Sequence, residues 1–187
     1  LKRKNIHNYE MSFSFGELGE RTFLFNAQPT ILKDNECNLM VLAFEDITER
    51  KIAEQLQSQF AAVVASSEDA IISKTPDGNI VSWNIGAETI YGYKAEEVVG
   101  KHISLLTSAE RKKEISVLIN KIIKGETVKH FDTIRICKDG TAKNVSISLS
   151  PIKDKNGKIV GISTIARDIT PRKKAEARLK YLNLLLQ

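Results

Sequence analysis

Metal and redox sites in proteins are most often built from cysteine and histidine side chains. Cys37 and Cys137 are the two cysteines of the chain, and they form no CxxC pair. Their spacing indicates neither a zinc site nor a disulfide framework. We therefore expect no metal site, and a reducing compartment, the cytoplasm, is the expected location.

Serine and histidine also occur, but no Ser/His/Asp arrangement has the sequence context that a hydrolase needs. The sequence contains no glycine-rich phosphate-binding loop, and no histidine follows Thr170 that could accept a phosphoryl group. We therefore expect these 187 residues to have no catalytic activity of their own.

Composition and charge are those of an ordinary globular chain. Hydrophobic residues make up 42% of the sequence, and 187 residues are enough for one large or two small domains. The excess of 28 Lys and Arg over 23 Asp and Glu is mild, and the basic clusters are scattered. Because the longest apolar runs are also too short to span a bilayer, we expect a soluble chain with neither nucleic acid nor membrane as a partner.

The strongest organising feature is a repeated joint between a strand pattern and a helix pattern. The segment 168–170, Asp-Ile-Thr, repeats the segment 46–48 after 122 residues. A period this long indicates two copies of a small domain rather than a solenoid of short repeats. Since each copy ends in a helix that leads onward, we assign signal relay to the residues of the joints: Asp46, Thr48, Asp168, Ile169 and Thr170.

The charges around the joints suggest how the aspartates act. Basic residues such as Arg172 begin each helix, where the helix dipole disfavours positive charge. We expect the aspartate of each joint to pair with a base in the first helical turn. The threonine of each joint should supply the N-cap oxygen.

Residues 1–48 carry three strand patterns, at 9–15, 21–32 and 39–45. Such a meander has one apolar face that nothing in this part of the chain covers, so it needs a partner or a missing half. Because the chain begins at Leu1 without methionine and its first copy lacks a front half, we interpret it as an excerpt from a longer protein.

The second copy has a full set of elements. A hairpin at 70–83 is followed by short helical pieces over 85–99, and Thr107 with Glu110 has capping-box spacing for a longer helix that ends at Gly125. Three further strands follow, up to residue 167. This order predicts an α+β domain in which helices cover one face of a five-stranded antiparallel sheet.

The motifs of the second copy resemble the PAS domain of the sensory-box type, common in bacterial and archaeal signalling proteins. The resemblance rests on DGNIVSWN at 77–84, on the glycine-rich segment 86–101 and on the DIT joint, and it covers residues 67–170. Residues 1–48 resemble only the C-terminal three strands of a second, preceding PAS domain. Between and after these parts lie a connecting amphipathic helix at 49–66 and a C-terminal signalling helix at 171–187.

The resemblance implies a sensory or regulatory module. Such a module binds a small ligand or partner and transmits the signal through its C-terminal helix to an output domain outside this chain, here expected to be a histidine kinase. A ligand-free dimerisation spacer is one alternative. A second alternative is a fragment of an enzyme, either a sensor histidine kinase or a chemotaxis methyltransferase fusion. Residues 19–27 resemble the PAS segments of such methyltransferase fusions.

PAS pockets lie between the sheet and the helices, so the resemblance also implies candidate cavity-lining residues. The alternative is that these side chains fill a close-packed core. A buried Trp83 would need an acceptor for its indole N–H. The candidates are Ile72, Trp83, Tyr93, Ile103, Leu106, Leu118, Ile122, Phe131 and Ile147.

The cofactors of the family make demands that this sequence does not meet. Haem-binding members place a histidine on the long helix, but residues 108–124 contain none, and His102 and His130 are expected at the surface or in the core. Flavin photosensor members have a reactive cysteine soon after the position of Gly100, and residues 101–106 contain none. We therefore expect neither haem nor covalent flavin, while non-covalent flavin and the identity of any other ligand stay open.

Both flanking helices carry an apolar stripe. Each stripe packs either on its own domain or on the same helix of a second chain. With the uncovered meander, the stripes lead us to expect a homodimer through the helices at 49–66 and 171–187. The stripe residues are Ile52, Leu56, Phe60 and Val63 in the first helix, and Ala175, Leu179, Leu182 and Leu186 in the second.

Overall fold

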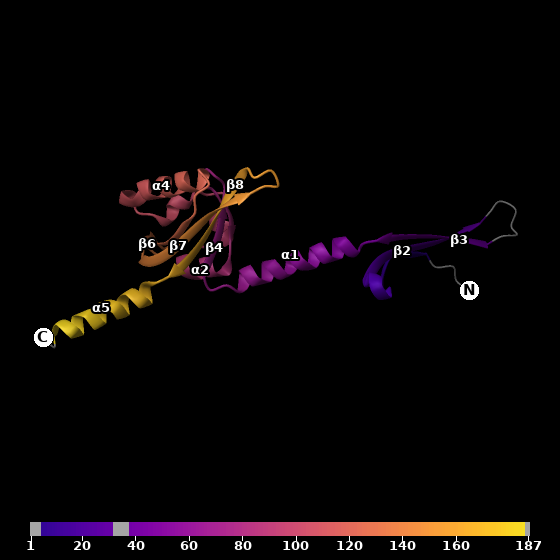
Figure 1. Cartoon of the computed structure of the whole chain (residues 1–187), viewed down its shortest axis with the longest axis horizontal. Helices are drawn as coiled ribbons and strands as arrows, with labels where there is room; N and C mark the ends of the chain where they lie inside the picture. The colour runs from indigo at the N-terminus through magenta and orange to yellow at the C-terminus, as the bar shows by residue number, and fades with distance from the viewer. Residues whose placement is uncertain (1–4, 32–37, 186–187) are drawn as a thin grey trace. The chain divides into compact units, whose positions relative to one another are not determined.

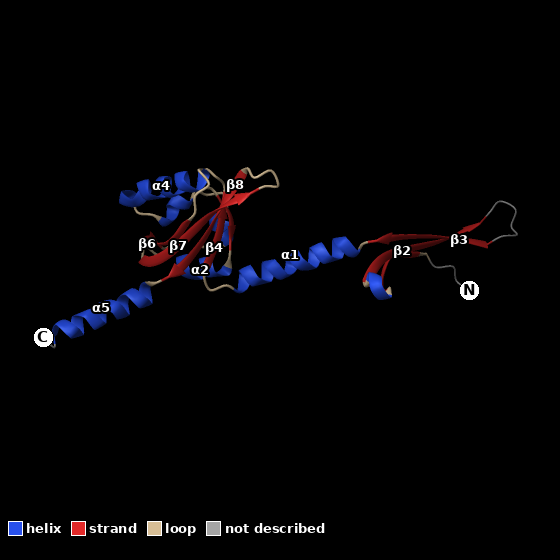
Figure 2. Cartoon of the chain, in the orientation of Figure 1, coloured by secondary structure: helices blue, strands red, loops and turns tan. Residues whose placement is uncertain are grey.

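The computed structural model describes residues 5–31 and 38–185. The chain separates into two compact units, and their boundary between Ala61 and Ala62 falls within helix α1 (Thr48–Ser66). Each unit has a β-sheet of its own (Figures 1 and 2). No helix in the described part of the chain has the length and apolar character needed to cross a membrane.

The first unit is a three-stranded antiparallel meander in the order β1-β2-β3. Five phenylalanine rings share one face of it, in neighbouring pairs whose centroids lie 6.0 to 6.5 Å apart. Phe15 is 47% exposed and Phe44 is 68% exposed, so this apolar face is open to solvent. The elements are β1 (Ile6–Ser14), the 3₁₀ turn η1 (Gly16–Leu18), β2 (Glu20–Ile31) and β3 (Asn38–Asp46).

The second unit contains the predicted five-stranded antiparallel sheet, and its strand order is β5-β4-β8-β7-β6. The central strand, β8, pairs with β4 on one side and with β7 on the other. The first and last strands of the domain are therefore neighbours. Their bounds are β4 (Ala70–Lys74), β5 (Ile80–Trp83), β6 (Val128–Ile136), β7 (Ala142–Lys153) and β8 (Ile159–Asp168).

Short helices connect the hairpin β4–β5 to the rest of this sheet, and the longest of them, α4, covers the sheet. Helix α4 lies beside the sheet (Figure 1) and contacts β6, β7 and β8. The members of its buried stripe are Ile115, Leu118, Ile119 and Ile122. Burying this stripe is what stabilises an amphipathic helix on a sheet. The elements are α2 (Ile85–Tyr91), α3 (Ala95–Val98), η2 (Ile103–Leu106), η3 (Ala109–Arg111) and α4 (Lys112–Ile123).

The predicted start of the long helix is wrong. Thr107 and Glu110 form no capping box, because a 3₁₀ turn occupies residues 109–111 and α4 begins at Lys112. Leu106 and Thr107 are both buried, and the Thr107 hydroxyl has no hydrogen-bond partner among the described residues. Packing of this segment into the core therefore overrides the local capping signal.

The duplication extends to the irregularities of the strands. The pairing of β1 with β2 shifts register over residues 6–9, and that of β6 with β7 shifts over residues 128–131. Each shift contains a non-glycine residue with positive φ, Asn8 at 53° and His130 at 50°. These two residues are 122 positions apart, so the bulge is part of the repeated unit.

The predicted stripes of the flanking helices are exposed. Thr48 is the only buried residue of α1, and no described residue of α5 (Thr170–Leu185) is buried. The exposed stripe residues include Ile52, Leu56, Phe60, Val63, Leu179 and Leu182. Leu186 and Cys37 lie outside the described residues.

Candidate functional site

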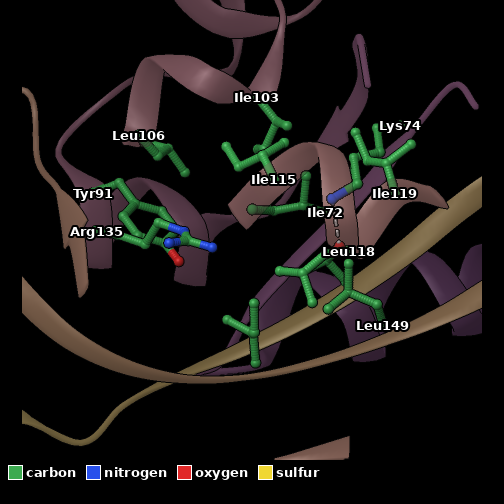
Figure 3. A pocket seen from close by; sticks show the side chains of 12 residues that line it. Ile72, Lys74, Tyr91, Ile103, Leu106, Ile115, Leu118, Ile119, Arg135 and Leu149 are labelled. Carbon is green, nitrogen blue, oxygen red and sulfur yellow. Dashed lines mark hydrogen bonds between the residues drawn. The ribbon is translucent and has the colours of Figure 1, made fainter. Parts of the chain in front are cut away.

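A small cavity lies in the second unit, between the sheet and the helices (Figure 3). Its volume is about 30 Å³, which is room for about two water molecules. Pockets for drug-sized ligands are typically about 300–1,000 Å³, so neither haem nor flavin fits the cavity as it stands. It is lined by Ile72, Lys74, Tyr91, Ile103, Leu106, Ile115, Leu118, Ile119, Arg135, Ile147, Leu149 and Thr164.

The structure brings together five of the nine candidate lining residues, namely Ile72, Ile103, Leu106, Leu118 and Ile147. The other four do not line the cavity. Ile122 is fully buried elsewhere in the core, and Phe131 is 37% exposed on the edge strand β6. Trp83 is buried beside Tyr91, and its Nε1–H donates to the Tyr93 carbonyl at 3.1 Å, which supplies the acceptor we expected.

The cavity is also lined by a lysine, Lys74, that was not among the predicted lining residues. Lys74 is 4% exposed, and its ammonium group donates to the Thr164 hydroxyl at 3.0 Å. No carboxylate pairs with Lys74 among the described residues. Burial, and then the positive charge of Arg135, lower the pKa of Lys74 to about 8.

Arg135 is the second buried cation, with 6% of its surface exposed. Its Nη1 donates to Glu114 at 2.8 Å, to the Thr133 hydroxyl at 3.0 Å and to the Ile134 carbonyl at 3.0 Å. Glu114 belongs to α4, so this cluster joins the helix to β6. Burial raises the pKa of Tyr91, which also lines the cavity, and its hydroxyl therefore stays protonated at neutral pH.

Strand alternation contained a signal for both cations. Lys74 follows Ile72 by two residues, and Arg135 lies between Thr133 and Cys137 at the same spacing, so both share the inward face of their strands. A basic residue next to a turn or on an edge strand is usually exposed, so Lys74 and Arg135 were not predicted to be buried.

The joint between β8 and α5 is held by hydrogen bonds to the sheet. The Asp168 carboxylate accepts the Thr170 N–H at 2.8 Å and lies 3.3 Å from the Lys143 ammonium. The Asn144 N–H donates to the Thr170 hydroxyl at 3.0 Å, and the Ile169 N–H donates to the Asn144 carbonyl at 2.9 Å. Burial alone would raise the pKa of Asp168, but the bonds from Thr170 and Lys143 lower it overall.

The predicted pairing of Asp168 with a base in the first helical turn is wrong. Asp168 pairs with Lys143 of β7, because its other oxygen is turned back onto the backbone at the helix start. Arg172 and Lys173 pair instead with Asp132 of β6, at 3.8 and 3.3 Å. The bases at the start of α5 therefore bind the helix to the sheet.

The predicted N-cap role of the two threonines is also wrong. The Thr170 hydroxyl accepts the strand N–H of Asn144, and the Thr48 hydroxyl accepts that of Thr22 at 2.9 Å. The aspartate two residues before each threonine accepts that threonine's own backbone N–H instead. Each threonine therefore connects its helix to the neighbouring strand.

Asn84 holds the other end of the domain, where α1 arrives, and the sequence analysis gave it no role. Its side-chain amide donates to the carbonyls of Val64 and Asp69, both at 3.0 Å. Its side-chain oxygen accepts the N–H groups of Ile71 at 2.8 Å and Ala87 at 2.9 Å. One buried amide thus links the end of α1 to β4 and α2.

Comparison with known proteins places this arrangement among signalling proteins. A family model described as PAS domain matches residues 68–171. The chain is 32% identical to two-component system protein A of Emericella nidulans over 152 residues, which is 79% of this chain and 22% of that protein. It is 29% identical to the methanogenesis regulatory histidine kinase FilI of Methanothrix harundinacea, over 70% of this chain and 15% of that protein.

A solved structure agrees with the family match. The crystal structure of a PAS domain from Colwellia psychrerythraea is 29% identical in sequence and superposes with a TM-score of 0.57. The match covers 62% of this chain and 98% of that one. This chain thus spans a small part of its curated relatives but contains nearly the whole of a solved domain.

Proposed function

Because the family model matches more than half of its residues, this chain belongs to the PAS-domain family, and we propose that residues 67–170 are the sensory module of a larger two-component protein. The module binds a small ligand or partner at its cavity and passes the change through β8 to α5. The output domain lies outside these 187 residues and is a histidine kinase. Relatives that are named as histidine kinases support this assignment.

The single observation that carries the proposal is that one strand reaches both the cavity and the joint. Thr164 lines the cavity and Asp168 begins the joint, and both belong to β8. Residues four apart on a strand point to the same face. A change in the hydrogen bond between Lys74 and Thr164 therefore has a short path to the start of α5.

The joint itself suits a hinge. It is held by a few polar contacts, and partly exposed ion pairs contribute at most about 1 kcal/mol each. A small motion of β8 can therefore re-aim the helix without unfolding the domain. Signal relay by Asp168, Ile169 and Thr170, and by Asp46 and Thr48 in the first unit, is part of the proposal.

Autophosphorylation of the full-length parent protein tests the proposal. Asp168→Asn should change the ratio of activities with and without stimulus, because it removes the charge that holds Lys143 at the joint. Lys153→Met, at an exposed position near the other end of β7, is the matched control. Equal responses from Asp168→Asn and wild type would remove Asp168 from the mechanism.

Homodimerisation through the helices 49–66 and 171–187 is the second part of the proposal. Leu179 is 62% exposed and Leu182 is 46% exposed, which leaves the seam of α5 available to a second chain. Truncating both to alanine should convert a micromolar dimer into monomer, since each buried leucine contributes about 2–5 kcal/mol. Sedimentation of the wild-type chain as a monomer at high concentration would exclude this interface.

A ligand-free dimerisation spacer is the second candidate function, and the small cavity volume favours it. Native mass spectrometry of the purified chain separates the two, because a sensory module retains or takes up a small molecule and a spacer does not. Since the cysteine spacing indicates no disulfide framework, we place either kind of module in the reducing cytoplasm.

A further inference from the structure

The cavity of the second unit has more positive charge than its own residues neutralise. Lys74 and Arg135 bring two positive charges, and the Glu114 carboxylate, which lies 2.8 Å from Arg135, is shared with the partly exposed Arg111 at 3.4 Å. We infer that the cavity binds a small carboxylate with a single charge, of the size of acetate, whose oxygens lie between Lys74 and Arg135. This inference rests on the proposed function and names the chemical class of its ligand.

Lys74 carries a buried positive charge that no carboxylate of the described residues neutralises. A buried ammonium group is normally paired, because leaving it unpaired in the interior is strongly unfavourable. Lys74 is 4% exposed, and among the described residues its ammonium group donates only to the neutral hydroxyl of Thr164. Arg135 adds repulsion, since its charge disfavours the protonated lysine. An anion in the cavity would offset both effects.

Donors for an anion are also available. An ammonium group has three N–H donors, and Lys74 uses one of them on Thr164. The side chain of Arg135 donates its hydrogen bonds through Nη1, so Nη2 and Nε have no partner among the described residues. Figure 3 shows Lys74 and Arg135 on opposite sides of the lining, with Tyr91 next to Arg135.

The rest of the lining favours a carboxylate over other anions. Most lining side chains are apolar, among them Leu106, Ile115 and Leu118, and they would pack on the carbon end of the ligand. A cavity of about 30 Å³ admits few non-hydrogen atoms, which excludes phosphate esters and larger acids. The single charge of Lys74, which no carboxylate of the described residues neutralises, matches one carboxylate.

The first unit shows that the shared strand pairing does not itself require a charge at the position of Arg135. Phe13 and Leu42 lie 122 residues before Arg135 and Thr164, at the same places in the strand pairing. An aromatic and an aliphatic residue thus occupy positions that are polar in the second unit. The buried Arg135 and its polar neighbour Thr164 are therefore features of the second unit, whereas β4 and its Lys74 have no counterpart among residues 1–48.

Titration of the whole chain with sodium acetate at neutral pH tests the inference directly. Acetamide has nearly the same shape without the charge, and sodium chloride at equal ionic strength controls for salt. Isothermal calorimetry should give saturable binding of acetate, with acetamide at least tenfold weaker and chloride unable to compete. A rise in melting temperature with acetate alone should accompany the binding.

Lys74→Met is the decisive variant, and Lys153→Met is its matched control. Methionine fits a buried site and removes an unpaired charge, so the variant should fold at least as well as wild type. It should bind acetate at least tenfold more weakly, whereas Lys153→Met, at an exposed position, should bind as wild type does.

Each other outcome is informative. Equal binding of acetamide and acetate by wild type would overturn the anion assignment but keep the cavity as a ligand site, and so keep the proposed function. Competition by chloride at the affinity of acetate would overturn the carboxylate class. No binding of either ligand would overturn the inference, while the response of the Asp168→Asn parent protein tests the proposed function separately.

Discussion

The two sheets of this chain share one kind of joint but differ in the face that each sheet presents. In the first unit the Thr22 N–H donates to the Thr48 hydroxyl at 2.9 Å, and in the second the Asn144 N–H donates to the Thr170 hydroxyl at 3.0 Å. Donor and acceptor in the second joint each lie 122 residues after their counterparts. The repeated sequence therefore builds the same connection twice.

The ion pairs at the joints follow the same shift. The carboxylate of each joint pairs with a base on the neighbouring strand, and a base in each first helical turn pairs with a carboxylate on the strand beyond. The pairs in the first unit are Arg21 with Asp46 at 3.7 Å and Lys51 with Glu10 at 2.8 Å, and those in the second are Lys143 with Asp168 and Lys173 with Asp132, both at 3.3 Å.

The faces of the two sheets differ in kind. Phe13 and Leu42 of the first unit correspond to the cavity residues Arg135 and Thr164 of the second. The comparison teaches that the joint is the shared part of the design and the sheet face is the specialised part. Under the proposed function, transmission is common to both units, whereas recognition of a carboxylate belongs to the second.

Replacing Arg135 by phenylalanine, the residue at the matching position of the first unit, should have the largest effect on stability. Arg135→Phe removes the buried cation that lies 2.8 Å from the Glu114 carboxylate, which keeps only the Thr133 hydroxyl and the exposed Arg111 as partners, and breaking a buried pair costs about 3–5 kcal/mol. Urea unfolding followed by the fluorescence of Trp83, the only tryptophan, reports on the second unit. Adding Glu114→Leu to Arg135→Phe should recover part of the lost unfolding free energy. An Arg135→Phe variant as stable as wild type would contradict a stabilising role for the cluster of Arg135, Glu114 and Thr133.

Lys74 should make the stability of the second unit depend on pH. Its folded pKa of about 8 lies below the ordinary value of 10.5, so between these values the unfolded chain binds more protons than the folded one. The unfolding free energy therefore rises as the pH increases from about 8, and the destabilisation is fully present below it. Each unit of pKa difference corresponds to about 1.4 kcal/mol.

The measurement is urea unfolding in carboxylate-free buffer at about pH 7.5 and about pH 9.5, for wild type and Lys74→Met. Tyr91, which shares the cavity with Lys74, should not titrate in this window, because burial keeps its hydroxyl protonated. Lys74→Met should lack the rise and be the more stable protein at the lower pH. The same rise in both proteins would assign it to other lysines.

Removing the threonine hydroxyl should affect both joints by a similar, smaller amount. Thr170→Val and Thr48→Val each remove the acceptor of one strand N–H and keep the volume of the side chain. One such bond contributes about 1 kcal/mol. Hydrogen exchange of the Asn144 and Thr22 amides should accelerate roughly fivefold, and a response at one joint alone would break the equivalence of the two units.

Asp168→Asn should have the smallest effect on stability. The asparagine oxygen can still accept the Thr170 N–H, and only the partly exposed pair with Lys143 loses its charge. The melting temperature should stay nearly unchanged, with a loss below about 1 kcal/mol. A large loss would mean that the joint is a rigid support rather than a hinge.

The fold was predictable because strand alternation, turn residues and the internal repeat all indicated the same architecture. Side chains were harder to place. Apolar residues such as Ile72 and Ile147 were predicted to line the cavity and do so, whereas Lys74 and Arg135 were missed because basic residues are rarely buried. Local rules also failed at Thr170, where a contact with the sheet replaces the helix cap.

Hydrogen–deuterium exchange of wild type and Lys74→Met tests the central claim, that the cavity and the start of α5 are coupled through β8. The account predicts that removing the cavity charge changes exchange several-fold at residues 164–173 as well as at β4, while Lys153→Met leaves residues 164–173 unchanged. A clear change at β4 and α4 with wild-type exchange over residues 164–173 would contradict the account.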